Sequence, residues 1–194
     1  MKANVIVAEM DPSRIDVARR ALTHEVIPRF RAQPGSARGH WMVNRSTGEL
    51  LVLTTWEDAE AMAAGLAADR TSRANLAERT GLGIRATRTM EVLGSTDAEP
   101  TGTPAARWVH ATWVQDPGPE ASPSGTIFDD ARPAPGSCGT YRLRDPETGT
   151  GLLLSFWARD DGRHRDLAHG LTVQRITVYE AIGATGPLRA DACR

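Results

Sequence analysis

Apolar and polar residues alternate with the period of a β-strand over two stretches that a short polar loop separates. Residues 39–44 and 49–56 alternate, and Arg45-Ser46-Thr47-Gly48 between them is typical of a hairpin connection. With these four residues as the loop, His40 lies opposite Leu53. The pattern therefore predicts a two-stranded hairpin whose faces follow from residue number.

The two faces of this hairpin differ in character. One face is almost wholly apolar and is expected to pack; it holds Trp41, Val43, Leu50, Val52, Thr54 and Trp56. The other face holds His40, Met42, Asn44, Glu49, Leu51, Leu53 and Thr55. Polar side chains on the second face are candidates for function.

A strand and a helix precede the hairpin. Residues 4–10 form a short apolar strand, after which Asp11 is expected to cap a helix with Pro12 in its first turn. Apolar residues then recur at helical spacing, and we expect Pro28 to end this helix.

A second helix and a last strand follow the hairpin. The helix begins at Glu57 or Asp58 and ends before Gly81, and residues 84–93 form the strand. The order is β-α-β-β-α-β, the ferredoxin-like split motif, so the fold class is α+β.

The hairpin sequence occurs twice. The stretch from Pro34, PGSARGHWMVNRSTGELLVLTTW, resembles PGSCGTYRLRDPETGTGLLLSFW from Pro135, and a one-residue gap aligns Tyr141 with Trp41. This indicates a tandem duplication of a unit of about 90 residues. We expect a first repeat over 1–94, a linker over 95–106, a second repeat over 107–185 and a tail over 186–194.

The helices of the second repeat are degenerate. Residues 117–135 hold too many Pro and Gly for a full helix, and the second helix is shortened to about 159–169. Each sheet would leave one face bare, so we expect the two sheets to pack face to face as an intramolecular dimeric α+β barrel. Any pocket is expected in the first repeat.

Composition narrows the class of partner. The chain has 194 residues and a formal net charge of −1, and its arginines alternate with acids. This pattern favours neither nucleic acid nor a membrane surface. The chain has no apolar run near the ~20 residues of a membrane helix, and we expect no secretory signal, because the first residues carry acids too early and too short an apolar run. Two cysteines without ligand spacing predict a reducing, cytoplasmic setting and no metal site.

One combination of motifs resembles a known family. Pro-Gly, a strand, a Thr-Gly turn, an apolar strand and TTWEDAEAM at a helix start are similar to the antibiotic biosynthesis monooxygenase family, of the dimeric α+β barrel superfamily. The resemblance covers nearly all of the first repeat and the second more weakly. It implies a fold that is shared by cofactor-independent monooxygenases acting on anthrone-like polyketides, haem-degrading monooxygenases and polyketide cyclases.

Several residues are candidates for roles in such a site. Trp56 would orient an aromatic substrate, His40 would act as a general base and Asn44 would hold an oxyanion. Substrate contacts would come from Asn4, Trp41, Met62, Leu66, Arg85 and Arg88. Simple structural roles stay open for all of them: tryptophans and aliphatic residues as core, His40 and Asn44 as surface polar residues, arginines in solvent.

The leading hypothesis is oxidation of an aromatic, polyketide-like phenol or anthrone by molecular oxygen, without a cofactor. Alternatives are a polyketide cyclase using the same pocket and a non-catalytic binding or regulatory module. Haem degradation ranks lower, because residues 57–80 contain neither the His nor the Trp of the haem-degrading relatives. The sequence leaves open whether the pseudo-dimer pairs further as a homodimer through its strand edges.

Overall fold

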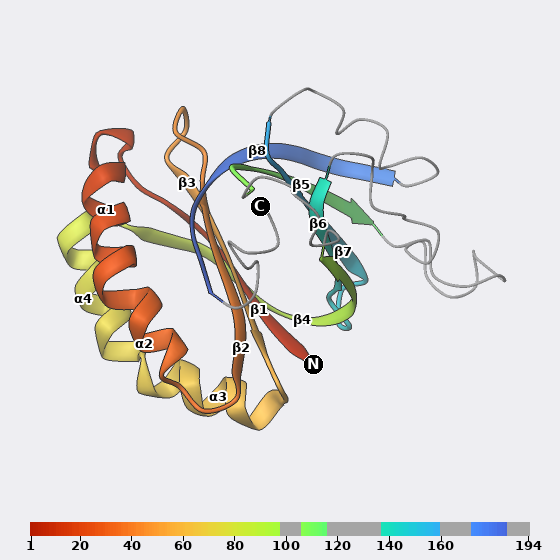
Figure 1. Ribbon diagram of the computed structural model, residues 1–194, viewed down its shortest axis with the longest axis horizontal. Helices are drawn as coiled ribbons and strands as arrows, with labels where there is room; N and C mark the ends of the chain where they lie inside the picture. Colours follow the sequence, from red (N-terminus) through yellow and green to blue (C-terminus); the bar gives the residue numbers. More distant parts are fainter. Residues whose placement is uncertain (98–105, 116–136, 160–171, 186–194) are drawn as a thin grey trace, which may run out of the picture. The chain divides into compact units, whose positions relative to one another are not determined.

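The computed structural model describes residues 1–97, 106–115, 137–159 and 172–185 (Figure 1). Its β-strands are β1 (Lys2–Glu9), β2 (Ser36–Val43), β3 (Glu49–Trp56), β4 (Gly83–Asp97), β5 (Trp108–Gln115), β6 (Ser137–Arg144), β7 (Thr150–Trp157) and β8 (Thr172–Thr185). Its helices are α1 (Ile15–Ala21), α2 (Ile27–Arg31), α3 (Ala59–Ala68) and α4 (Arg70–Thr80). The chain divides into two compact units, and the points of division along the sequence fall within β4 and within β8. The first unit holds residues 1–89 and the end of β8, and the second holds residues 90–178.

The first unit is a sheet with its four helices on one face. Figure 1 shows α1 and α2 running beside α3 and α4 over β1, β3 and β2. The predicted hairpin register is confirmed, since His40 pairs with Leu53 and the Asn44 N–H donates to the Glu49 carbonyl at 2.8 Å. The predicted packing face is confirmed as well: five of its six residues join one buried cluster with the helices, namely Trp41, Val43, Leu50, Val52 and Trp56.

The first helical segment contains a correction to the sequence prediction. The Asp11 cap is confirmed, because its carboxylate accepts the Ser13 N–H at 2.8 Å. Pro28 does not end the helix: a π-helical segment, Leu22–Val26, comes first, and Pro28 lies in the first turn of α2. A first-turn proline needs no N–H donor, and the widened π turn relieves the clash that its ring would make in a regular helix.

The second helical segment is two helices. The Asp58 side chain caps α3 by accepting the Ala61 N–H at 2.8 Å, and Gly81 ends α4 with a positive φ of 70°, as predicted. Asp69 interrupts the predicted single helix, with φ −91° and ψ 0° between α3 and α4. The break changes which side chains of α4 point toward the sheet.

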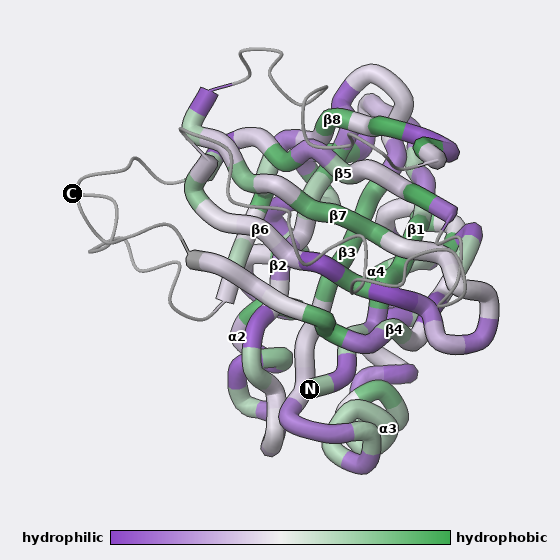
Figure 2. The backbone as a smooth tube through the Cα atoms, turned by 90° about the vertical axis from the view of Figure 1, so that its right-hand side faces the viewer, coloured by the Kyte–Doolittle hydropathy of each residue, from purple (hydrophilic) through white to green (hydrophobic). Residues whose placement is uncertain are grey.

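The second unit repeats the strand register of the first. In the first unit Trp56 pairs with Lys2 and Ser36, and in the second Trp157 pairs with Trp108 and Ser137. The central strands β3 and β7 are hydrophobic along most of their length, and all of β7 is buried (Figure 2).

This register corrects the alignment of the two copies. The predicted one-residue gap put Tyr141 in the place of Trp41, which pairs with Val52. In the second hairpin Leu153 takes the place of Val52, and it pairs with Arg142, while Tyr141 pairs with Leu154. Paired residues of an antiparallel sheet share a face. The copies therefore align without a gap, and Arg142 occupies the place of Trp41.

The last strand of each sequence copy ends beside the other copy's hairpin. The end of β4 runs to Asp97, past the predicted 84–93, and pairs with β6; the end of β8 pairs with β2. The strand order β1-β3-β2-β8-β5-β7-β6-β4 closes on itself. The fold is thus α+β with a closed eight-stranded sheet, while sheet-to-sheet packing stays a prediction.

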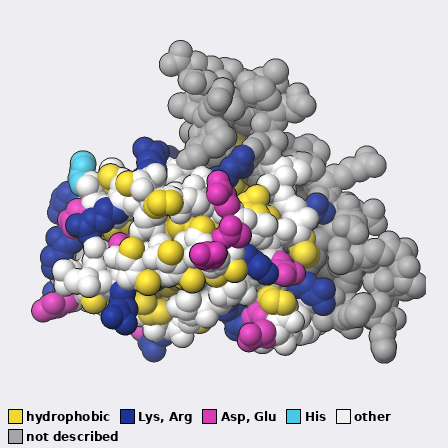
Figure 3. Space-filling model, turned by 90° about the horizontal axis from the view of Figure 1, so that it is seen from below, with side chains coloured by type: hydrophobic (Ala, Val, Ile, Leu, Met, Phe, Trp, Pro, Cys, Tyr) yellow, Lys and Arg dark blue, Asp and Glu magenta, His cyan; other side chains and the backbone are white. Residues whose placement is uncertain are grey.

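Some predicted features fall where the structure gives no description. The segment 117–135 and the tail 186–194 lie outside the described residues, as does nearly all of the shortened helix at 159–169. In the part that is described, no helix is long and apolar enough to cross a membrane. The face in Figure 3 shows basic and acidic side chains interspersed among apolar ones.

Candidate functional site

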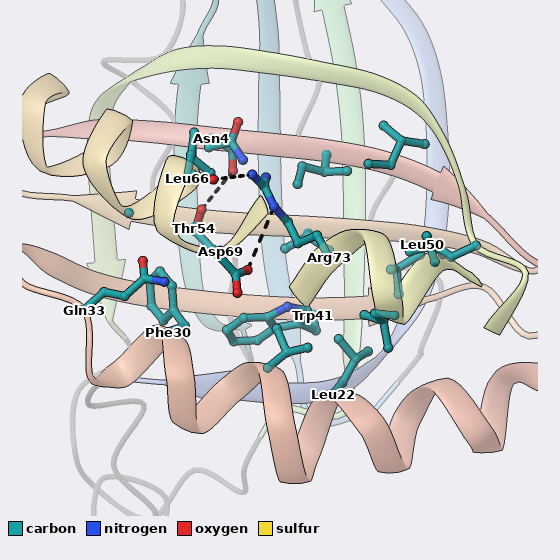
Figure 4. A pocket seen from close by; sticks show the side chains of 18 of the residues that line it. Asn4, Leu22, Phe30, Gln33, Trp41, Leu50, Thr54, Leu66, Asp69 and Arg73 are labelled. Atoms are coloured by element: carbon teal, nitrogen blue, oxygen red, sulfur yellow. Dashed lines mark hydrogen bonds and ion pairs between the residues drawn. The ribbon is translucent and has the colours of Figure 1, made fainter. Parts of the chain in front are cut away.

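A cavity of about 90 Å³ lies inside the first unit, between the sheet and the helices (Figure 4). Strands β1, β2 and β3 form its floor, to which β4 adds Ile84. The π-helical segment and α2 form one wall, and α3 and α4 form the other. The lining is mainly apolar or aromatic: Ile6, Leu22, Val26, Phe30, Trp41, Leu50, Val52, Trp56, Gly65, Leu66, Leu76, Ala77, Leu82 and Ile84. Five polar residues complete it: Asn4, Gln33, Thr54, Asp69 and Arg73.

Irregular points in both helical segments border this space. Leu22 and Val26, the two ends of the π-helical segment, line it, and so does Asp69 at the break between α3 and α4. A Cβ atom at Gly65 would lie 2.2 Å from the Trp56 ring. Glycine at this position therefore lets α3 lie directly over the indole of Trp56.

Three aromatic rings form one rigid side of the cavity. Phe30 meets Trp41 edge to face at a centroid distance of 5.7 Å and Trp56 at 5.2 Å. Edge-to-face pairs of this kind stabilise by about 0.5–1.5 kcal/mol each beyond the area they bury. The rings are thus held in fixed orientations that suit contact with another aromatic ring.

Asn4 projects from β1 into this apolar space. Its side chain is 1% exposed, and within the described residues neither its amide nitrogen nor its amide oxygen has a hydrogen-bond partner. The neighbouring Thr54 is already engaged, since its hydroxyl accepts the Trp56 indole N–H at 3.2 Å and donates to the Asn4 main-chain carbonyl at 3.5 Å. An unpaired buried amide costs about 1–3 kcal/mol, so Asn4 is suited to a ligand that supplies a partner.

A carboxylate and a guanidinium face the same cavity from the opposite wall. Figure 4 shows Asp69 and Arg73 extending into it from the junction of α3 and α4. Burial raises the pKa of Asp69, and the charge of Arg73 partly opposes that rise. The Arg73 Nε lies 3.9 Å from the Asp69 carboxylate, and its Nη2 donates to the Leu66 carbonyl at 2.5 Å.

Four of the residues singled out from the sequence meet at this cavity: Asn4, Trp41, Trp56 and Leu66. Met62 is buried in the surrounding core cluster and is not among the lining residues. The sequence reasoning did not find Asp69 and Arg73, because in a continuous polar helix they look like a surface pair at i and i+4. The signal that could have found them is a pair of opposite charges four residues apart, directly after the stretch 61–68, which is rich in small residues.

The remaining candidates lie elsewhere. His40 is on the opposite face of β2 and is buried, at 2% exposure. The simpler interpretation of His40 as a polar surface residue is therefore wrong. Arg85 is exposed and forms an ion pair with Glu9, while Arg88 is half-buried and is not among the lining residues.

Asn44 has a structural task in the hairpin loop. Its side-chain oxygen accepts the N–H groups of Ser46 and Thr47, at 3.0 and 3.2 Å. In the second hairpin, Asp145 accepts the N–H groups at the equivalent positions, two and three residues after it, at 2.9 and 3.2 Å. A side chain that closes its own loop in both units needs no catalytic role to explain it.

The second unit has His110 and Ser155 at the register positions of Asn4 and Thr54, whereas Trp157 repeats Trp56. All three residues of the second unit are buried. The His110 ring stacks on Trp157 at a centroid distance of 5.7 Å. In the part of the chain that is described, no three His, Cys, Asp or Glu side chains converge as a metal site.

Comparison with known proteins supports the fold. No protein-family profile and no curated protein sequence matches the chain. Solved structures do match. A candidate monooxygenase from Fusobacterium nucleatum has 10% identity and a TM-score of 0.66, over 96% of this chain and 94% of that one, and another from Lactobacillus acidophilus has 8% identity and a TM-score of 0.61, over 95% and 96% of the two chains. An anthrone oxidase-like protein has 11% identity and a TM-score of 0.57, over 95% of this chain and 92% of that one. The chain shares their α+β barrel fold, and at this identity the likeness extends no further.

Replacing the unpaired amide should stabilise the protein. Asn4→Leu keeps a similar volume and removes the cost of a buried polar group, so thermal or urea unfolding should show a gain of about 1–3 kcal/mol. Asn44→Leu is the matched control and should lose stability, because that amide is hydrogen-bonded. A loss of stability in Asn4→Leu would mean that the Asn4 amide is satisfied in solution.

The half-buried carboxylate of Asp69 should make stability depend on pH. The folded-state pKa of Asp69 is raised above its ordinary value of 3.8, so the folded protein binds the carboxyl proton more tightly than the unfolded chain does. The free energy of unfolding therefore falls as the pH rises from the unfolded-state pKa to the folded-state pKa. Asp69→Asn removes the loss: the variant should gain on the wild type from about pH 4 upward and match it at lower pH. Urea melts across pH measure this, with exposed Glu78→Gln as control; a gain that is the same at all pH values would contradict it.

Proposed function

We propose that the first unit is a monooxygenase-type active site that oxidises a small aromatic molecule with an acidic O–H or C–H bond, using molecular oxygen and no bound cofactor. The observation that carries this proposal is the unpaired Asn4 amide inside an aromatic cavity. Such a site offers flat stacking surfaces and one fixed group that can hydrogen-bond to oxygen.

The chemistry needs the protein at one step. An anthrone or phenol that loses a proton becomes electron-rich enough to pass an electron to oxygen. Overall, the CH₂ group of an anthrone and O₂ give C=O and H₂O, and a phenol and O₂ give a quinone and H₂O. The Asn4 N–H groups would donate to the oxygen of that anion. Removing one such donor typically costs about 10²–10³ in rate, because the apolar surroundings strengthen its effect.

The fold comparison gives this proposal a limited kind of support. One structure with the same fold is named anthrone oxidase-like. Because the sequences share 11% identity, the oxidation of an aromatic substrate by this chain rests on its own cavity. A cytoplasmic location and pairing into a homodimer stay predictions.

We also propose that the chain arose by tandem duplication. The gap-free correspondence of strand registers supports this, as does the loop closure that Asn44 and Asp145 share. After duplication only the first unit would have kept an apolar surface around Asn4. The change of Trp41 to Arg142 at the equivalent place fits such a divergence.

Oxygen uptake tests the proposal. Purified protein with no added cofactor should consume oxygen with an anthrone or a single-ring hydroquinone above the autoxidation background. Asn4→Leu should lower the rate roughly 100-fold. His40→Asn is the control on the other face of β2 and should keep the rate within about twofold, once melting shows it to be folded.

Other outcomes point to other functions. Loss of uptake in His40→Asn with Asn4→Leu unchanged would move the chemistry to the other face of the sheet. Turnover under argon would indicate a cyclase-like proton-transfer catalyst, and binding without turnover a ligand-binding module. A Soret band with added haem would favour haem chemistry.

A further inference from the structure

The lining of the cavity contains one carboxylate and one guanidinium, Asp69 and Arg73. We propose that Asp69 is the proton acceptor of this site for a single-ring phenol or enol, and that Arg73 and Asn4 together hold the anion that results. The inference deepens the proposed function and rests on it for the place of the ligand. It assigns the base to α3–α4, away from His40.

The position of Asp69 suits this role. It joins α3 to α4, where an aspartate usually caps the following helix, but its side chain makes no capping hydrogen bond to α4. Its contact with Arg73 is an ion pair of 3.9 Å, longer than a hydrogen bond. The carboxylate is therefore able to accept a hydrogen bond from a molecule in the cavity.

Arg73 is held so that its charge stays at the cavity. Its Nη2 donates to the Leu66 carbonyl near the end of α3, which anchors the guanidinium across the helix break. Arg29 also contributes positive charge near Asp69. An anion in the cavity would thus meet one fixed positive charge and the unpaired Asn4 amide, which both line it.

The proton transfer is balanced within the site. The phenol O–H bond breaks, its proton moves to an Asp69 carboxylate oxygen and the electron pair stays on the phenolate oxygen. Burial raises the proton affinity of Asp69, which makes it a better base than an aspartate in water. The number of charges does not change, since one anion replaces another beside Arg73.

The size of the cavity sets the class of ligand. Its volume of about 90 Å³ is below the ~150 Å³ of a protein cavity that holds benzene. A single ring could be enclosed after small shifts of the lining side chains. A fused three-ring anthrone would have to protrude or displace a helix, so a single-ring phenol is the better fit.

A nitrophenol tests the assignment without turnover, because its phenolate absorbs visible light. We would titrate full-length protein with 4-nitrophenol under argon, about one pH unit below the pKa of the free phenol. Wild-type protein should show the phenolate band with no net release of protons to the solvent. Asp69→Asn should bind the phenolate and release about one proton for each molecule bound. Arg73→Gln should reduce the band at least tenfold.

Two controls lie on the same helix outside the cavity, Glu78→Gln and Arg79→Gln, and both should behave as wild type. If Asp69→Asn does not fold, Asp69→Ser replaces it. Proton release by the wild type, identical behaviour of Asp69→Asn, or failure to bind would each overturn the inference. Oxygen uptake is a separate measurement. Uptake without proton transfer to Asp69 would refute the role of Asp69 and leave the proposed oxidation standing. Proton transfer to Asp69 without oxygen uptake would refute the oxidation and leave the role of Asp69 standing.

Discussion

The first unit depends on covering one apolar face of the sheet formed by β1, β3 and β2. Trp41 and Trp56 dominate that face, and Phe30 packs edge-on against both. Large rings leave gaps unless the covering helices follow them closely. Here the helices depart from regular α-helical geometry at the π-helical segment Leu22–Val26 and at the break at Asp69, and the cavity borders both places.

Inside that apolar shell, each polar group has a cost. The Asn4 amide lacks a partner among the described residues, and Asp69 is partly desolvated beside a single guanidinium. Sites that bind and activate a ligand commonly keep such groups at the expense of stability. Asn4 and Asp69 come from different elements, β1 and the α3–α4 junction, so the fold itself sets their distance.

Local chemistry could be predicted from the sequence, and long-range geometry could not. The hairpin register, the packing face and the caps at Asp11, Asp58 and Gly81 follow from rules that act over a few residues. The continuation of the helix past Pro28 depends on a π turn that no period reveals. Asp69 and Arg73 line the cavity at the break between α3 and α4 and in the first turn after it, and a pattern of polar residues does not show that break.

The central claim is that a phenol occupies the cavity and hydrogen-bonds to Asn4, and side-chain amide NMR tests it most directly. The ¹⁵N–¹H₂ signals of Asn4 would be assigned by their absence in Asn4→Leu, with the Asn44 amide as an internal reference in the same spectrum. The account predicts that a single-ring phenol shifts the Asn4 signals and leaves those of Asn44 in place. Binding of the phenol with unchanged Asn4 signals would contradict it.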